Sequence, residues 1–173
     1  MFESSSHSRR WFAIALVGPI LAGAILGLRG GPLAMAVFAL GLPAILAAVT
    51  LLTAPTLYVG GAVLGSRLSL ADVATATGRA LHATGLALLG VAPLGLLLCA
   101  MLPAPAQVPA QAILLVVVAL VVGLHRLRTE LRTDAGAGPV AANLLLATHA
   151  VVAFIIGARL FHDLYRLNER ISS

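Results

Sequence analysis

The sequence has little charge, one cysteine and no lysine. Charged residues make up 10% of its 173 residues, and aromatic residues make up 5%. With no second cysteine, Cys99 can form neither an internal disulfide nor a cysteine-based zinc site. Because Cys99 lies inside an apolar run, we expect a buried, unreactive thiol rather than a redox centre or a metal ligand.

Known catalytic patterns are missing as well. The chain contains no GxSxG, HExxH or P-loop motif and no pair of carboxylates within an apolar run. Its serines lie outside the deep parts of the apolar runs, which disfavours an intramembrane serine protease. A basic helix with interleaved aromatic residues, typical of nucleic-acid binding, is also absent. We therefore predict a protein that is not an enzyme, holds no metal and binds no nucleic acid.

Apolar residues, in contrast, are abundant. They account for 60% of the chain, and the mean hydropathy is +1.04. A soluble domain has about 45–50% apolar and about 25% charged residues, and a water-soluble fold of this length cannot cover so much apolar surface. The solvent for most of the chain is therefore lipid, and the predicted fold class is all-α, a polytopic transmembrane helix bundle.

Five segments are long and apolar enough to cross a membrane, which takes about 20 residues of helix. The first has the basic start of a signal peptide, but its apolar run exceeds the usual length of about 7–15 residues, and we expect it to remain uncleaved. The second contains Pro43 and Pro55 and is interpreted as one kinked helix, with a helical hairpin turning at residues 53–56 as the alternative. The predicted spans are residues 11–28, 33–64, 84–102, 110–124 and 140–158.

Small residues predict where these helices pack closely. Gly23 and Gly27 form one GxxxG pair, and Gly61 and Gly65 form another. Such pairs let two helix backbones approach each other in a membrane.

Between the second and third spans lies an amphipathic stretch, residues 69–82. Ser69 followed by Asp72 has the pattern of a capping box. The stretch is predicted to form an interfacial helix at the membrane surface. The other segments are predicted as a cytoplasmic tail (residues 1–10), a short uncharged loop (103–109), a polar stretch (125–139) and a polar C-terminal helix and tail (159–173).

The positions of the arginines predict the orientation, because cytoplasmic loops carry an excess of basic residues. Five spans with the N-terminus inside place seven arginines in the cytoplasm and four outside, whereas six spans place five inside and six outside. Five spans are therefore favoured, and a re-entrant fifth segment stays open as a variant that returns the tail to the cytoplasm. Arginine without lysine in a chain rich in alanine, glycine and leucine suggests GC-rich coding, hence a bacterial inner membrane.

His149 is the ionisable residue deepest in a predicted span, near mid-membrane, and Asn143 lies in the same span. Such groups are costly in lipid and are candidates for a function. We favour a neutral His149 hydrogen-bonded to a neighbouring helix, with a haem ligand or a proton relay as alternatives. His82 and His125, expected at the membrane interface, could pair with each other. With Arg79 they form an alternative haem or quinone site.

Two charged segments are candidates for contacts with partner proteins. The first has the i, i+3, i+4, i+7 spacing of a single helix face and is interpreted as a solvated helix end, with partner docking as the alternative; it contains Arg159, His162, Asp163 and Arg166. The second is interpreted as a topology signal that contacts lipid headgroups, with docking of a cytosolic partner as the alternative. It contains Arg126, Arg128 and Arg132, with an expected Arg126–Glu130 ion pair.

The stretch TLYVGGAVLGSRLSLADVATATGRALHATGLALLGVAPLGLLL, with the basic HRLRTEL after the fourth span, resembles the Yip-domain family. The resemblance covers residues 44–158 and implies a five-span fold with membrane-trafficking partners. RALHATGLALLG and GARLFHDLY are similar to segments of succinate dehydrogenase membrane anchors, which hold a haem and a quinone. The serine and the His-Arg adjacency of those anchors are missing here.

Together these features predict a non-enzymatic integral membrane protein, without a cofactor, that binds partner proteins or organises a membrane complex. The expected partners are the lipid bilayer and other membrane or cytosolic proteins, a homo-oligomer included. One alternative is an anchor subunit that binds haem b or a quinone. A second is a small transporter subunit, suggested by the spans that proline and glycine interrupt, which would need a continuous polar cavity.

Overall fold

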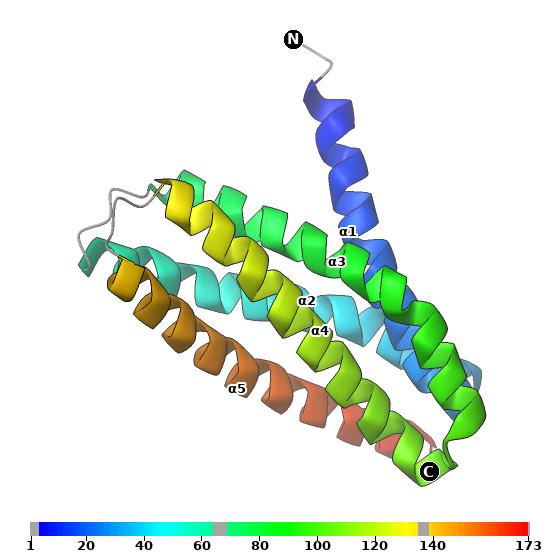
Figure 1. The fold of residues 1–173 in the computed structure, drawn as a ribbon. Coiled ribbons are helices and arrows are strands. Elements are labelled where there is room, and N and C mark those ends of the chain that lie inside the picture. Colours follow the sequence, from blue (N-terminus) through cyan, green and yellow to red (C-terminus); the bar gives the residue numbers. More distant parts are fainter. Residues whose placement is uncertain (1–3, 64–68, 135–138, 173) are drawn as a thin grey trace.

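The computed structural model describes residues 4–63, 69–134 and 139–172 and has an all-α fold, which confirms the predicted fold class. A short 3-10 helix, η1 (Leu28–Gly30), joins the first two long helices. The long helices are α1 (Ser4–Gly27), α2 (Gly31–Val63), α3 (Leu70–Met101), α4 (Ala104–Asp134) and α5 (Pro139–Ser172) (Figure 1).

The helices alternate in direction, so the two termini lie toward opposite ends of the bundle (Figure 1). α1 packs closely on α2, because a Cβ atom added at Gly23 would collide with the carbonyl of Phe38, and one at Gly27 with that of Ala34. The predicted close packing at this GxxxG pair is confirmed. Gly65 of the second pair and Arg67 lie outside the described residues.

Four of the helices are long and apolar enough to cross a membrane, and the described part of α1 adds a shorter apolar helix, Leu16–Leu26. Large apolar side chains such as Leu40, Leu51 and Val63 are more than two-thirds exposed on the outer surface. An exposed apolar surface of this extent is the surface of a membrane protein. The four candidate spans are Leu28–Val63, Leu70–Met101, Gln107–Glu130 and Asn143–Ile171.

α2 is one continuous helix that contains both Pro43 and Pro55. The alternative of a helical hairpin at residues 53–56 is therefore wrong. Hydroxyl groups in this region bond within the helix, Thr53 Oγ1 donating to the carbonyl of Val49 at 2.7 Å and Thr56 Oγ1 to that of Thr53 at 2.6 Å.

The stretch 69–82, predicted as an interfacial helix that runs into the third span, forms the start of α3. The capping box is confirmed, since the Asp72 N–H donates to Ser69 Oγ at 3.2 Å and the Ser69 N–H donates to Asp72 Oδ2 at 2.9 Å. The apolar face of this stretch is buried inside the bundle. Val73, Ala76 and Ala80 pack with residues from the three neighbouring helices, namely Leu57, Leu127 and Leu146.

The predicted loop at residues 103–109 is also wrong, because α4 begins at Ala104. Buried amides hold this first part of α4 against α3. The side-chain amide of Gln111 donates to the Gly95 carbonyl at 2.7 Å, and that of Gln107 donates to Cys99 Sγ at 2.9 Å. Cys99 is buried as expected. Nothing in the proline-rich sequence signalled that these glutamines would lie inside the bundle.

Candidate functional site

A cavity of about 200 Å³ lies between α2, α3, α4 and α5. It is long and narrow, because the residues that line it extend along α5 from His149 to Phe161, roughly 18 Å of helix. Most of its lining is apolar. This cavity is therefore not the continuous polar cavity that the transporter alternative requires, and that alternative stays a prediction.

The two ends of the cavity differ in polarity. Thr53, Thr77 and His149 line one end. The opposite end is lined by apolar residues from four helices, namely Leu42, Leu88, Leu115 and Phe161, and Ala22 of α1 belongs to the same apolar cluster.

The threonines of the cavity use their hydroxyl protons inside their own helices. Thr77 donates to the carbonyl of Val73 at 2.5 Å, and Thr84 donates to that of Ala80 at 2.9 Å. His149 differs from them, because its Nδ1 atom is buried without a hydrogen-bond partner among the described residues. A buried polar atom left without a partner costs about 1–3 kcal/mol. Among the described polar side chains that line the cavity, His149 is therefore the one with a buried atom that lacks a hydrogen bond.

His149 lies closer to one end of the bundle than predicted. Leu146, less than one turn earlier on α5, packs in one cluster with Leu127 of α4. Leu127 directly follows Arg126, so His149 lies near the level of the charged part of α4. The favoured hydrogen bond to a neighbouring helix is not formed at Nδ1 by the described residues. Asn143 is exposed, is not part of the cavity lining and does not join His149 in one site.

His82 and His125 lie at the same level of α3 and α4, between two points where these antiparallel helices meet. A Cβ atom at Gly123 would lie 3.1 Å from Thr84 Oγ1, and Arg79 Nη1 lies 2.7 Å from Glu130 Oε2. Neither histidine is among the residues that line the cavity, where His149 is the one histidine of the described lining.

Arg79, assigned above to the alternative haem or quinone site, belongs to an ion-pair cluster. Glu130 accepts from Arg79 and also from Arg126, whose Nη2 atom lies 2.8 Å from Glu130 Oε1. The predicted Arg126–Glu130 pair is confirmed. The Glu130 side chain is 11% exposed, so one nearly buried carboxylate holds α3 and α4 together through two arginines. Arg128 is exposed, and the side chain of Arg132 lies outside the described residues.

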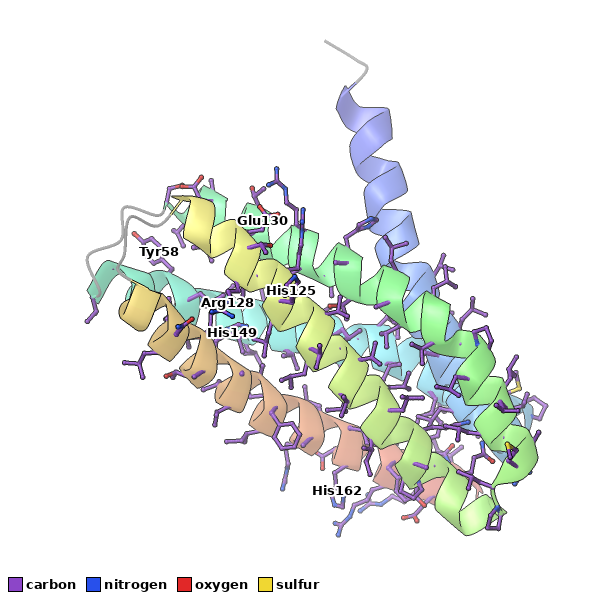
Figure 2. All side chains as sticks on the ribbon, viewed as in Figure 1. Tyr58, His125, Arg128, Glu130, His149 and His162 are labelled. Carbon is purple, nitrogen blue, oxygen red and sulfur yellow. The ribbon has the colours of Figure 1, made fainter. Side chains whose placement is uncertain are left out.

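The charged residues near the end of α5 share its outer face, as predicted. Arg159 Nε lies 3.5 Å from Asp163 Oδ2, and their side chains are 76% and 54% exposed. His162 and Arg166 are exposed too, and Figure 2 shows His162 pointing away from the neighbouring helices.

This charged face does not lie at the end of the bundle. α2 and α5 run antiparallel, and a Cβ atom at Gly157 would meet Val49, while one at Gly41 would meet Leu164. Arg159, His162 and Asp163 therefore lie alongside residues 41–49, in the middle of α2. Phe161 between them packs at the level of Leu115 in α4. The interpretation as a solvated helix end does not fit this arrangement, because the sequence alone does not show how far α5 is shifted along its neighbours.

The fold and the exposed apolar surface define an integral membrane protein, a bundle of long helices with an apolar cavity between four of them. Comparison of the chain with family models, curated proteins and solved structures finds no match. The resemblances to the Yip-domain family and to succinate dehydrogenase anchors therefore stay predictions, as does the haem or quinone site.

Proposed function

We propose that this is a non-enzymatic integral membrane protein that binds another membrane-spanning protein through the charged outer face of α5. This face consists of Arg159, His162, Asp163 and Arg166. One observation carries the proposal. The face is exposed at a level of the bundle where the neighbouring helices have no charged residue.

The neighbouring helices set the level of the hydrocarbon. Residues 31–63 of α2, 80–101 of α3 and 104–124 of α4 contain no aspartate, glutamate, lysine or arginine. These three uncharged runs coincide where Leu42, Leu88 and Leu115 pack together. A bilayer core about 30 Å thick has to cover this level. It then also surrounds Arg159 and Asp163, which flank Phe161 on α5.

Charged groups facing lipid at this depth are unfavourable. Insertion of an arginine or aspartate at the centre of a transmembrane helix costs about 2.5–3.5 kcal/mol. Charged residues within membranes therefore face other protein groups or water-filled cavities. The Arg159–Asp163 pair reduces this cost only in part, because both side chains remain more than half exposed. A second transmembrane segment packed on this face would remove them from lipid.

The charges also indicate what the partner offers. Arg159 is paired with Asp163, whereas Arg166 has no ion-pair partner among the residues that the structure describes. The face thus carries one uncompensated positive charge when His162 is neutral. One to three turns away, Phe154 and Ile155 provide exposed apolar contacts on α5. The proposed partner is a transmembrane helix with an apolar surface and a carboxylate at the level of Arg166.

We place the protein in a bacterial inner membrane with its N-terminus in the cytoplasm. The end of the bundle that carries Arg79, Arg126 and Arg128 is the one from which α1, α3 and α5 start. Basic residues accumulate on the cytoplasmic side, which supports this orientation.

Photocrosslinking in native membranes tests the proposal. A photoreactive amino acid at Ile155 or Leu167 of α5 should give one and the same crosslinked protein, and the substitution Arg166→Leu should reduce its yield at least tenfold. The matched controls are the same probe at Leu33 of α2, which is exposed on a different helix, and the substitution Arg128→Leu near the opposite end of the bundle. Crosslinks to lipid alone from α5 would refute the proposal, and a crosslink to a second copy would replace the proposed partner by a homo-oligomer.

A further inference from the structure

We propose that the cavity between α2, α3, α4 and α5 holds one long-chain amphiphile from the membrane, a fatty acid or an acyl chain of a lipid. Its oxygen-bearing head lies at His149, and its hydrocarbon chain extends along α5 toward Phe161. This inference is independent of partner binding by α5, because the cavity lies on the inner side of that helix.

The cavity is a narrow, half-open channel whose dimensions suit part of a single chain, with the rest of the chain in the opening between the helices. An apolar cavity of about 150 Å³ is large enough to take up benzene. Here about 200 Å³ is spread along a path of roughly 18 Å between His149 and Phe161. A volume this narrow does not suit two chains side by side or a wide planar ring system. Its long axis runs parallel to the helices, as lipid chains do in a bilayer.

The cavity exists because small side chains face one another across it. Ala150, Ala153 and Gly157 line it from α5, and Ala112, Ala119 and Gly123 line it from α4. Small residues usually let membrane helices approach until they touch. A Cβ atom at Gly157 would lie 3.7 Å from Val49 of α2 and would have no contact with the described residues of α4 within 4 Å. The space between the small residues of α4 and α5 is thus left for a ligand.

The polarity of the two ends gives the orientation of the ligand. The threonine hydroxyls near His149 donate within their own helices, so each can still accept a bond but has no proton to offer. His149 lines the same end, and no described residue bonds its Nδ1 atom. A neutral imidazole has one donor and one acceptor nitrogen. A carboxyl or ester oxygen beside this ring supplies the partner that the protein does not.

Charge near this end favours an oxygen head over a cationic amine. Arg126 and Arg79 share the single carboxylate of Glu130, and Arg128, two residues after Arg126, is exposed on α4. Two arginines for one acid, with a third close by, leave the surroundings positive. A fatty acid carboxylate or the ester carbonyl of a lipid fits this environment.

Photolabelling of the purified chain in lipid nanodiscs tests the proposal, with palmitic acid that carries a diazirine in its chain as the probe. We expect the label on cavity residues of α4 and α5 and competition by unmodified palmitic acid. The substitution Ala153→Phe should reduce labelling at least tenfold, whereas Val151→Phe on the exposed side of the same helix should leave it unchanged. His149→Leu should weaken binding about tenfold, as expected for a lost hydrogen bond.

Ala119→Phe fills the cavity from α4 and replaces Ala153→Phe if that variant does not fold, as judged by gel filtration and circular dichroism. Native mass spectrometry distinguishes the two sources of the chain. A bound phospholipid that is lost in the filled variant and not displaced by palmitic acid assigns the cavity to a lipid acyl chain. Equal labelling of the filled variant and Val151→Phe would overturn the proposal.

Discussion

At the scale of single residues, most described polar side chains inside this bundle have hydrogen-bond or ion-pair partners within the protein, and one buried side-chain atom has none. Glu130 binds two arginines, and Gln107 and Gln111 bond to α3 and to each other. Among the described residues, His149 Nδ1 is the buried side-chain atom that lacks a partner. Satisfied groups fix how the helices pack, whereas an unsatisfied one offers a bond to a ligand.

Replacing Glu130 tests whether its ion pairs hold α3 against α4. Glu130→Gln keeps the shape but removes the charge that Arg79 and Arg126 share. Hydrogen bonds to charged groups contribute about 1.5–3 kcal/mol each. Both arginines are about half exposed, so we expect a total loss of about 1 kcal/mol after solvent screening. Reversible unfolding in mixed micelles measures it. Arg128→Gln, on an exposed residue of the same helix, should change stability little; equal effects of both variants would contradict this role.

At the scale of elements, each helix follows local rules that the sequence displays. Ser69 and Asp72 start α3 with a capping box, and Gly23 and Gly27 let α1 approach α2. Local rules were misleading at α4, where three prolines suggested a loop. Two of the three prolines lie just before α4 or in its first turn, where the missing N–H of proline would have no partner. Pro109 lies further inside the helix, and buried glutamines on either side of it hold this segment on α3.

The capping box gives a prediction for α3 alone. Ser69→Ala removes the acceptor of the Asp72 N–H and should lower the free energy of unfolding by about 1 kcal/mol, since loss of an N-cap costs about 0.5–2 kcal/mol. Hydrogen exchange in the first turn of α3 should become faster. Thr75→Ala, six residues further along, serves as the control, because the Thr75 hydroxyl bonds the carbonyl of Ala71 in its own helix. Unchanged exchange in Ser69→Ala would show that the cap does not stabilise this end.

At the scale of the whole molecule, the axial shift between helices creates both proposed sites. α5 is displaced along α2 and α4 so that its charged face lies beside residues 41–49, while His149 lies near the Arg126–Glu130 level. The same arrangement leaves the cavity between the small residues of α4 and α5.

Filling the cavity should stabilise the protein when no ligand is bound. Ala153→Leu adds apolar atoms to empty space and should raise the free energy of unfolding by about 1 kcal/mol in delipidated micelles, since removal of cavity volume recovers about 24 cal/mol per Å³. Thermal unfolding before and after addition of palmitic acid measures this, and the gain should vanish with ligand present. Ala76→Leu, in a packed cluster outside the cavity lining, should destabilise by overpacking. Equal destabilisation by both variants would argue against a free cavity.

The sequence by itself determined the fold class, the apolar helices, the capping box and the one-sided charge of α5, because composition and periodicity are local properties of the chain. Only the tertiary structure decided how deep each polar group lies. The sequence alone predicts the depth of each apolar run separately, which places His149 at mid-membrane and the Arg159–Arg166 face at a solvated helix end. Packing contacts such as Gly41 with Leu164 and Gly157 with Val49 set the shift of α5 instead. Those contacts join residues more than a hundred positions apart, and no local pattern encodes them.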